Sequence, residues 1–121
     1  MKFKEEFSYD QRVNESTKVI NKYPERIPVI CEKLSKSNSN TPNIDKKKYL
    51  VPKDLTLGQF IYIIRKRIGI DPAQGLFLFA NGIIPSTSMN MSEIYFLHKD
   101  SDGFLYLKYS CENVFGHLRK L

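Results

Sequence analysis

The side chains best able to do catalytic chemistry here are two cysteines and two histidines, Cys31, Cys111, His98 and His117. A cysteine beside a histidine is a nucleophile, and the same residue types at short fixed spacings bind zinc. The sequence contains no CxxC, HExxH or His-x-Glu pattern, no P-loop and no GxSxG. Cys31 lies in an apolar run, which is typical of a core cysteine. We therefore predict free thiols, no catalytic residues and no metal site, with a thiol enzyme using Cys31 or Cys111 as the catalytic alternative.

Two basic clusters, at 46–48 and 65–67, lie next to Tyr49 and Tyr62. The chain carries a net charge of +6 and has a pI of about 9.3, which favours acidic partners such as nucleic acid, anionic lipid or acidic peptides. Basic residues interleaved with aromatic ones are a nucleic-acid signal, but the aromatic pair of an RNA-recognition strand is missing. A solvated face that steers acidic peptides is the interpretation we favour, and a basic RNA-binding protein is the alternative.

The C-terminal residues form a third candidate site. Polar residues 110–113 are followed by Val114, Phe115 and Gly116, and then by the five residues HLRKL. A glycine has no Cβ, so a free tail that contains one fits a narrow enzyme channel. The alternative is an ordinary flexible chain end.

The composition bounds the fold that must position these residues. With 121 residues, 41% of them hydrophobic and 26% charged, the chain is predicted to form one domain with its own core. The longest apolar run, 60–64, is much shorter than a membrane span, and the first 20 residues are charged where a signal peptide would be apolar. We expect a soluble, intracellular chain.

Local patterns predict the elements. The pair Ser8 and Gln11 is a capping box for helix in an arm over 1–26, and Thr56 and Gln59 form another box for a helix over 57–68 that ends at Gly69. Strands are predicted at 27–34 and 46–52, joined by a polar loop, and at 104–109. A hairpin is predicted over 76–84 around Asn81-Gly82, and a short helix at about 89–97.

This order predicts an α+β protein of the ubiquitin-like β-grasp type, in which a mixed four-stranded sheet packs on one main helix and follows an N-terminal helical arm. The expected organisation is an arm at 1–26, a core at 27–110 and a flexible tail at 111–121.

Several apolar residues are left over after this core is assigned. Pro28 and Ile30 have the non-core parity of their strand, and Ile63 lies beside the buried stripe of the main helix. An exposed strand edge between apolar pockets would suit an extended peptide that adds to the sheet as a strand. The alternative is that these residues pack under the N-terminal helices.

The sequence resembles the autophagy ubiquitin-like modifiers, which include the GABARAP and light-chain-three proteins. The resemblance covers nearly the whole chain and is carried by seven blocks in order: RIPVICEK at 26–33, IDKKKYLVP at 44–52, LTLGQF at 55–60, IRKR at 64–67, HKD at 98–100, DGFLY at 102–106 and ENVFG at 112–116. Cys111 stands where the family usually has glycine.

The resemblance implies a conjugation cycle. A cysteine protease would cleave after Gly116, and activating and conjugating enzymes would then join the Gly116 carboxylate to the amine of phosphatidylethanolamine, with no other cofactor. The protein would be a monomer in the cytoplasm before conjugation. After lipidation it would lie on autophagosomal or vacuolar membranes and recruit cargo receptors and adaptors, with no nucleic acid as partner.

The resemblance also implies a two-pocket groove for peptides of aromatic-x-x-aliphatic type. The aromatic pocket corresponds to Glu15, Val19, Pro28, Ile30, Lys48, Leu50 and Phe104. The aliphatic pocket corresponds to Tyr49, Val51, Pro52, Leu55, Phe60 and Ile63. Charge contacts to acidic residues that flank the motif would come from Arg26, Lys46 and Arg67, and recognition of the tail by enzymes would involve Phe115, Phe77 and Phe79.

Overall fold

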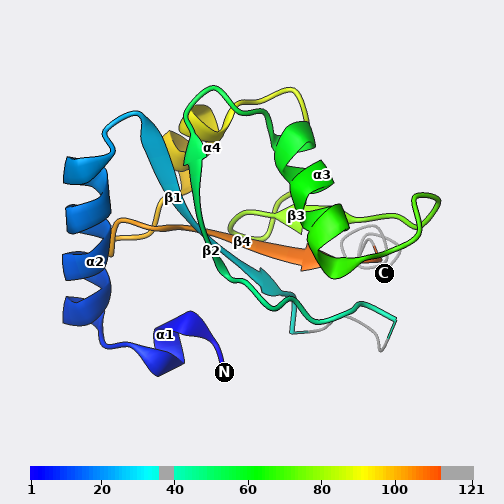
Figure 1. Ribbon diagram of the computed structural model, residues 1–121, viewed down its shortest axis with the longest axis horizontal. Coiled ribbons are helices and arrows are strands. Elements are labelled where there is room, and N and C mark those ends of the chain that lie inside the picture. Colours follow the sequence, from blue (N-terminus) through cyan, green and yellow to red (C-terminus); the bar gives the residue numbers. More distant parts are fainter. Residues whose placement is uncertain (36–39, 113–121) are drawn as a thin grey trace.

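The computed structural model describes residues 1–35 and 40–112 (Figure 1). Two helices come first, then a strand pair, and then helices alternating with strands. In chain order the elements are α1 (Phe3–Glu6), α2 (Tyr9–Lys22), β1 (Arg26–Lys33), β2 (Lys48–Pro52), α3 (Leu57–Ile68), β3 (Phe77–Phe79), α4 (Met91–His98) and β4 (Leu105–Ser110).

The strands form one sheet in the order β2-β1-β4-β3. The central strands β1 and β4 are parallel, with Val29 opposite Leu105, whereas β2 and β3 pair antiparallel to them at the two edges. In Figure 1 the sheet lies between α2 on the left and α3 on the right. This mixed sheet with one main helix on one face and a helical arm on the other is the predicted β-grasp.

Capping side chains begin the three longer helices. Ser8, Thr56 and Asn90 each accept a hydrogen bond from the backbone N–H three residues later. Satisfying these otherwise unpaired donors stabilises a helix start by about 1 kcal/mol. Gly69 ends α3 in the left-handed conformation, with φ of 69°. The two capping boxes predicted from sequence and the predicted end of α3 are confirmed.

The main core lies between α3 and one face of the sheet. Leu57, Phe60 and Ile64 are buried along one side of α3. They pack with side chains that alternate along the central strands: Ile27, Val29, Cys31, Leu105, Leu107 and Tyr109. The prediction that Ile27, Val29 and Cys31 share the core-facing side of the first strand is therefore confirmed.

The opposite face of β1 is covered as well, which corrects one prediction. Ile30 is fully buried in a second cluster with Phe3 and Phe104, whose rings lie 5.2 Å apart edge to face. Pro28 is also buried. The expectation that this face points outward is wrong, because the N-terminal helices fold back across it.

Two strand boundaries also differ from prediction. The Asn81-Gly82 turn has the expected positive φ values of 49° and 80°, but after it only a single bridge joins Ala80 and Ile83. Because β3 finds its ladder partner in β4, residues 83–84 form no strand and stay largely exposed. Strand β2 begins at Lys48 and not at 46, since the Lys46 carbonyl accepts a hydrogen bond from the Tyr49 hydroxyl.

Candidate functional site

Strand β2 is an edge strand that pairs only with β1. Among residues 1–35 and 40–112, no strand pairs with its other edge, which leaves backbone donors and acceptors there. The side chains of β2 alternate, so Tyr49 and Val51 enter the main core beside α3, whereas Lys48 and Leu50 lie on the α2 side. The edge therefore separates two surfaces at which the predicted pockets would lie, which we name the depression toward α2 and the depression toward α3.

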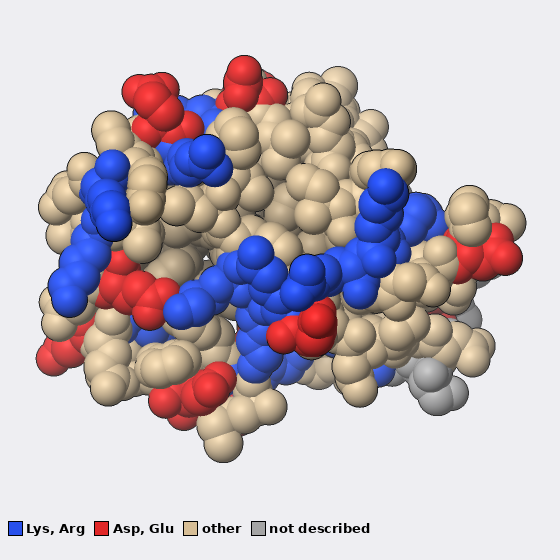
Figure 2. Space-filling model, viewed as in Figure 1, with Lys and Arg blue, Asp and Glu red and all other residues tan. Residues whose placement is uncertain are grey.

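The depression toward α2 contains the residues assigned to the aromatic pocket. Pro28, Ile30 and Phe104 are buried beneath it, and because Ile30 is 0% and Phe104 2% exposed, these two support the floor from below and leave almost no surface for a ligand. Across its mouth, Lys48 Nζ lies 2.9 Å from Glu15 Oε2 and so connects β2 to α2. Figure 2 shows a hollow between α2 and the centre of the molecule, with basic side chains running past it. The walls are the half-buried side chains of Val19 and Leu50.

The depression toward α3 contains the residues assigned to the aliphatic pocket. Phe60 is fully buried, and its ring meets that of Tyr49 edge to face at 5.5 Å. Phe60 therefore supports the floor from below and has no surface left for a ligand. The surface available to a ligand comes from Ile63, which is 39% exposed, from exposed Pro52 and from half-buried Leu55.

The three expected charge contacts lie around this edge, each with a partner of its own. Arg67 donates two hydrogen bonds to Asp45, at 2.9 and 3.3 Å, and the first of these holds the pKa of the Asp45 carboxyl below its usual range. Lys46 Nζ lies 5.0 Å from the centre of the Tyr49 ring, and Arg26 donates to the Leu50 carbonyl. An acidic peptide would have to displace Asp45 to reach Arg67.

Several lysines of the basic band seen in Figure 2 form ion pairs with neighbouring carboxylates. Lys48 is paired with Glu15, and Lys47 lies 3.8 Å from Glu6 and 3.9 Å from Glu32. A phosphate-tracking surface needs lysines and arginines that are free to replace counterions. This arrangement does not favour the alternative of an RNA-binding protein, and the absence of a nucleic-acid partner stays a prediction.

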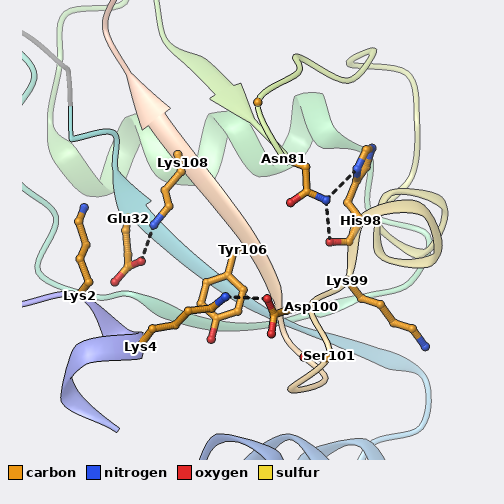
Figure 3. Close-up of a pocket in the computed structure, with 11 residues that line it drawn as sticks. Lys2, Lys4, Glu32, Asn81, His98, Lys99, Asp100, Ser101, Tyr106 and Lys108 are labelled. Atoms are coloured by element: carbon orange, nitrogen blue, oxygen red, sulfur yellow. Dashed lines mark hydrogen bonds and ion pairs between the residues drawn. The ribbon is translucent and has the colours of Figure 1, made fainter. Parts of the chain in front are cut away.

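The buried thiol of Cys31 has the wrong electrostatics for a nucleophile. Its side chain is 0% exposed, and burial, reinforced by the negative charge of Glu32, raises the pKa of the thiol. Reactive cysteines have lowered pKa values and some exposure. His98 lies beside Asn81, with 3.3 Å between Nδ1 and the amide nitrogen, at a cavity whose lining excludes Cys31 (Figure 3).

That cavity, of about 600 Å³, is rich in charge, and two of its four lysines are paired with carboxylates of the same lining. Lys4 lies 2.6 Å from Asp100 and Lys108 lies 2.9 Å from Glu32 (Figure 3). In the described part of the chain no group of three or more histidine, cysteine or acidic side chains is placed to hold a metal ion. Sequence reasoning missed Glu32, although a carboxylate inside an otherwise apolar strand was the available signal.

The residues assigned to processing are only partly within the described structure. Phe115 and Gly116 lie outside it. On the edge strand β3, Phe77 is half-buried and Phe79 is 2% exposed. Their role toward enzymes stays a prediction.

Fold and topology define a ubiquitin-like protein, and comparisons with known proteins define its family. The family model described as "Autophagy protein Atg8 ubiquitin like" matches residues 11–116. Autophagy-related protein 8 of Schizosaccharomyces pombe is 56% identical over 94% of this chain and 93% of its own length. The protein of the same name from Mycosarcoma maydis is 54% identical over 96% of this chain and 97% of its own. The chain belongs to the Atg8 family and is a ubiquitin-like modifier of autophagy.

Solved structures agree. Trypanosoma brucei ATG8 superposes with a TM-score of 0.84 at 41% identity, covering 91% of this chain and 93% of that one. Plasmodium falciparum Atg8, solved in complex with a Plasmodium falciparum Atg3 peptide, superposes with a TM-score of 0.85 at 38% identity. The match covers 93% of this chain and 98% of that one. Among the described residues, no helix has the length and apolar character needed to cross a membrane.

Proposed function

We propose that this modifier is conjugated through Gly116 to phosphatidylethanolamine, after a cysteine protease removes the five residues that follow it. The match to the family model ends at Gly116, which supports this residue as the end of the mature chain. Activating and conjugating enzymes would carry the Gly116 carboxylate as a thioester to the lipid amine. In these reactions the chain is the substrate and supplies no catalytic group. It needs no cofactor, and the lipid becomes covalently attached to it.

Lipidation accounts for how the protein changes location. The unconjugated monomer is cytoplasmic, and two acyl chains hold the conjugate on the autophagosomal or vacuolar membrane. There it recruits receptors and adaptors.

Recruitment uses the edge of β2, and the free edge between two apolar depressions is the observation that carries this proposal. A peptide of aromatic-x-x-aliphatic type adds alongside β2 as a strand. Its aromatic side chain enters the depression toward α2 and its aliphatic side chain enters the one toward α3. Each filled depression contributes about 1.5–3 kcal/mol before ordering costs. Together with backbone pairing along β2, we expect an affinity near 1 μM, or about −8 kcal/mol.

Acidic residues beside the motif meet the surrounding cations. Arg26, Lys46 and Arg67 lie around the edge, and the exposed Arg67–Asp45 pair is weak enough to exchange partners. The relative solved with an Atg3 peptide supports peptide binding as a shared property, which we extend here to the enzymes of the conjugation pathway.

The conjugation proposal is tested by intact mass of the cellular protein from soluble and membrane fractions, with Gly116→Ala for comparison. We expect a soluble form ending at Gly116 and a membrane form heavier by one phospholipid, both absent in the variant. A chain ending at Leu121 in every fraction would overturn the conjugation proposal and leave the groove proposal standing.

The groove proposal is tested by calorimetry with a synthetic aromatic-x-x-aliphatic peptide preceded by acidic residues. Leu50→Ala and Lys48→Ala should each weaken binding at least five-fold. Lys66→Ala removes an exposed cation of α3 that lies over the Tyr62 ring and is assigned to neither depression, so it is the matched control and should leave affinity unchanged. Equal affinities for all four proteins would refute the assignment.

A further inference from the structure

Helix α4 presents large apolar side chains to solvent. Phe96 is 81% exposed and Leu97 is 61% exposed, although Met91 and Ile94 of the same two-turn helix are fully buried. Single exposed apolar residues are common on protein surfaces, but adjoining ones beside a hollow indicate an interaction site. Aromatic side chains are also enriched at the centres of binding interfaces.

Phe96 stands at the rim of a cavity of about 480 Å³. The cavity lies where the end of α2, the start of β1 and α4 meet. All three elements contribute to its apolar lining, which consists of Ile20, Pro24, Ile27, Pro28 and Tyr95. A medium-sized apolar side chain fits such a volume, and Phe96 would pack against it from the rim.

Three cations complete the lining, Arg26, Lys53 and Lys99, and no carboxylate does. Within residues 1–35 and 40–112, none of the three lies within ion-pair distance of an acidic side chain. Arg26 donates to a backbone carbonyl and Lys99 lies 5.6 Å from the Tyr95 ring, so neither positive charge is neutralised. The cavity rim is therefore electrostatically complementary to an acidic ligand.

We propose that this junction is a second docking surface, which binds a protein segment carrying one large apolar side chain flanked by acidic residues. The apolar side chain enters the cavity against Phe96, and the acidic residues pair with Lys53 and Lys99. The surface shares Pro28 and Arg26 with the β2 groove, but Phe96, Lys53 and Lys99 belong to it alone, so a segment bound through these three residues leaves the β2 edge open to a peptide.

The position of the surface favours a protein segment over a membrane as the occupant. The cavity lies at the end of the sheet where β1 starts, and the parallel strands β1 and β4 both run away from it (Figure 1). β4 ends at Ser110, at the far end of the sheet from the cavity. A concave cavity of about 480 Å³ takes up a protruding side chain, which a protein segment offers and a flat membrane surface does not.

The test is a titration of the isotope-labelled full chain with a 12-residue synthetic peptide that has a central Phe and Leu between glutamates, followed by NMR. The β2 groove is first saturated with an aromatic-x-x-aliphatic peptide. We expect shifts centred on Ile20, Phe96 and Lys99. A peptide in which lysines replace the glutamates should bind at least ten-fold more weakly.

Variants separate the surface from its surroundings. Phe96→Gln and Lys53→Glu should each weaken the acidic peptide at least five-fold, and both side chains are exposed enough for the fold to be kept. Ile83→Gln and Lys18→Glu remove a comparable exposed apolar group and a comparable charge elsewhere, and should have no effect. Leu50→Ala should affect the groove peptide alone.

Three results would overturn the proposal. The first is an absence of shifts around the cavity at millimolar acidic peptide. The second is equal binding of the lysine peptide. The third is self-association by analytical ultracentrifugation that Phe96→Gln abolishes, which would assign the surface to a second copy of the chain.

Discussion

The backbone N–H of Phe3 donates a 2.7 Å hydrogen bond to the carboxylate of Glu32, a residue 29 positions away on the central strand β1. The same carboxylate accepts from Lys108 of β4 at 2.9 Å and is only 3% exposed. One buried acid thus ties the N-terminal arm to the middle of the sheet, at Phe3, which packs with Ile30 and Phe104 of the groove.

Replacing this acid should loosen the arm. Glu32→Gln keeps the shape of the side chain but removes the charge that strengthens both hydrogen bonds, so we expect unfolding free energy to fall by about 2 kcal/mol. Denaturant titration measures the loss, and limited proteolysis should cut before residue 9 faster than in the parent. Glu25→Gln, on an exposed residue, is the control and should change neither. An equally protected arm in the Glu32 variant would contradict this role.

The contacts of Glu32 also make the stability of the fold depend on pH. Burial by itself raises the pKa of Glu32, but the hydrogen bonds from Lys108 and the Phe3 N–H outweigh it and leave the pKa lowered. The pKa of Asp100 is lowered as well: burial by itself raises it, but the hydrogen bonds from Lys4 and the Asp102 N–H, together with the positive charges of Lys4 and Arg12, outweigh burial. A carboxyl with a lowered folded pKa stabilises the fold above its unfolded value and loses this contribution as pH falls through the folded one.

Melting temperature should therefore be flat near neutral pH and fall from about pH 4.5 downward, where unfolded carboxyls begin to bind protons. Glu32→Gln should make this fall shallower, because it removes one of the carboxyls whose folded pKa is lowered. Thermal melts between pH 7 and pH 2.5 test both statements. A parent and a variant with parallel curves would show that Glu32 does not contribute.

Gly103 allows the turn before β4 to approach α2 closely. A Cβ at this position would lie 2.4 Å from Ser16 Oγ, and the backbone φ is +94°. Ser16 Oγ also donates to the Asp102 carbonyl at 2.5 Å, so it is held in place. Gly103→Ala should cost more than about 2 kcal/mol of unfolding free energy, because overpacking adds to backbone strain.

Gly69 is the matched control for this substitution. It also has a positive φ, of +69°, but a Cβ there meets nothing within 4 Å. Gly69→Ala should therefore show backbone strain alone, about 1 kcal/mol. Equal losses in the two variants by denaturant titration would mean that the Ser16 contact is relieved at no cost.

The two cysteines should differ in reactivity. Cys31 is fully buried with a raised pKa, whereas Cys111 is only half-buried. At pH 8, iodoacetamide should modify Cys111 of the folded protein and leave Cys31 unlabelled until urea is added, as read by peptide mass. The Cys111→Ser variant isolates Cys31. Fast labelling of this variant in its folded state would revive the thiol-enzyme alternative.

Much of the fold follows from patterns within a few residues. The pairs Ser8 and Gln11, and Thr56 and Gln59, exchange side chain and backbone hydrogen bonds as the sequence predicts. Such signals are legible because both partners lie within one turn of chain. The family blocks identify the class of protein for a related reason, since they are runs of consecutive residues. Most candidate groove residues also lie in these blocks; Glu15, Val19 and Ile63 do not. The blocks do not tell which of the groove residues are accessible to a ligand.

The sequence by itself determined the starts of α2 and α3, the end of α3 at Gly69, the core-facing parity of β1 and the membership of the Atg8 family. Only the tertiary structure decided that Ile30 is buried, that Phe60 supports the groove from beneath, and that Glu32 holds Phe3. The physical reason is that a capping hydrogen bond depends on neighbours in sequence. Burial of a strand face depends on which distant segment covers it, and apolar alternation in β1 is the same whether that face meets α1, a peptide or water.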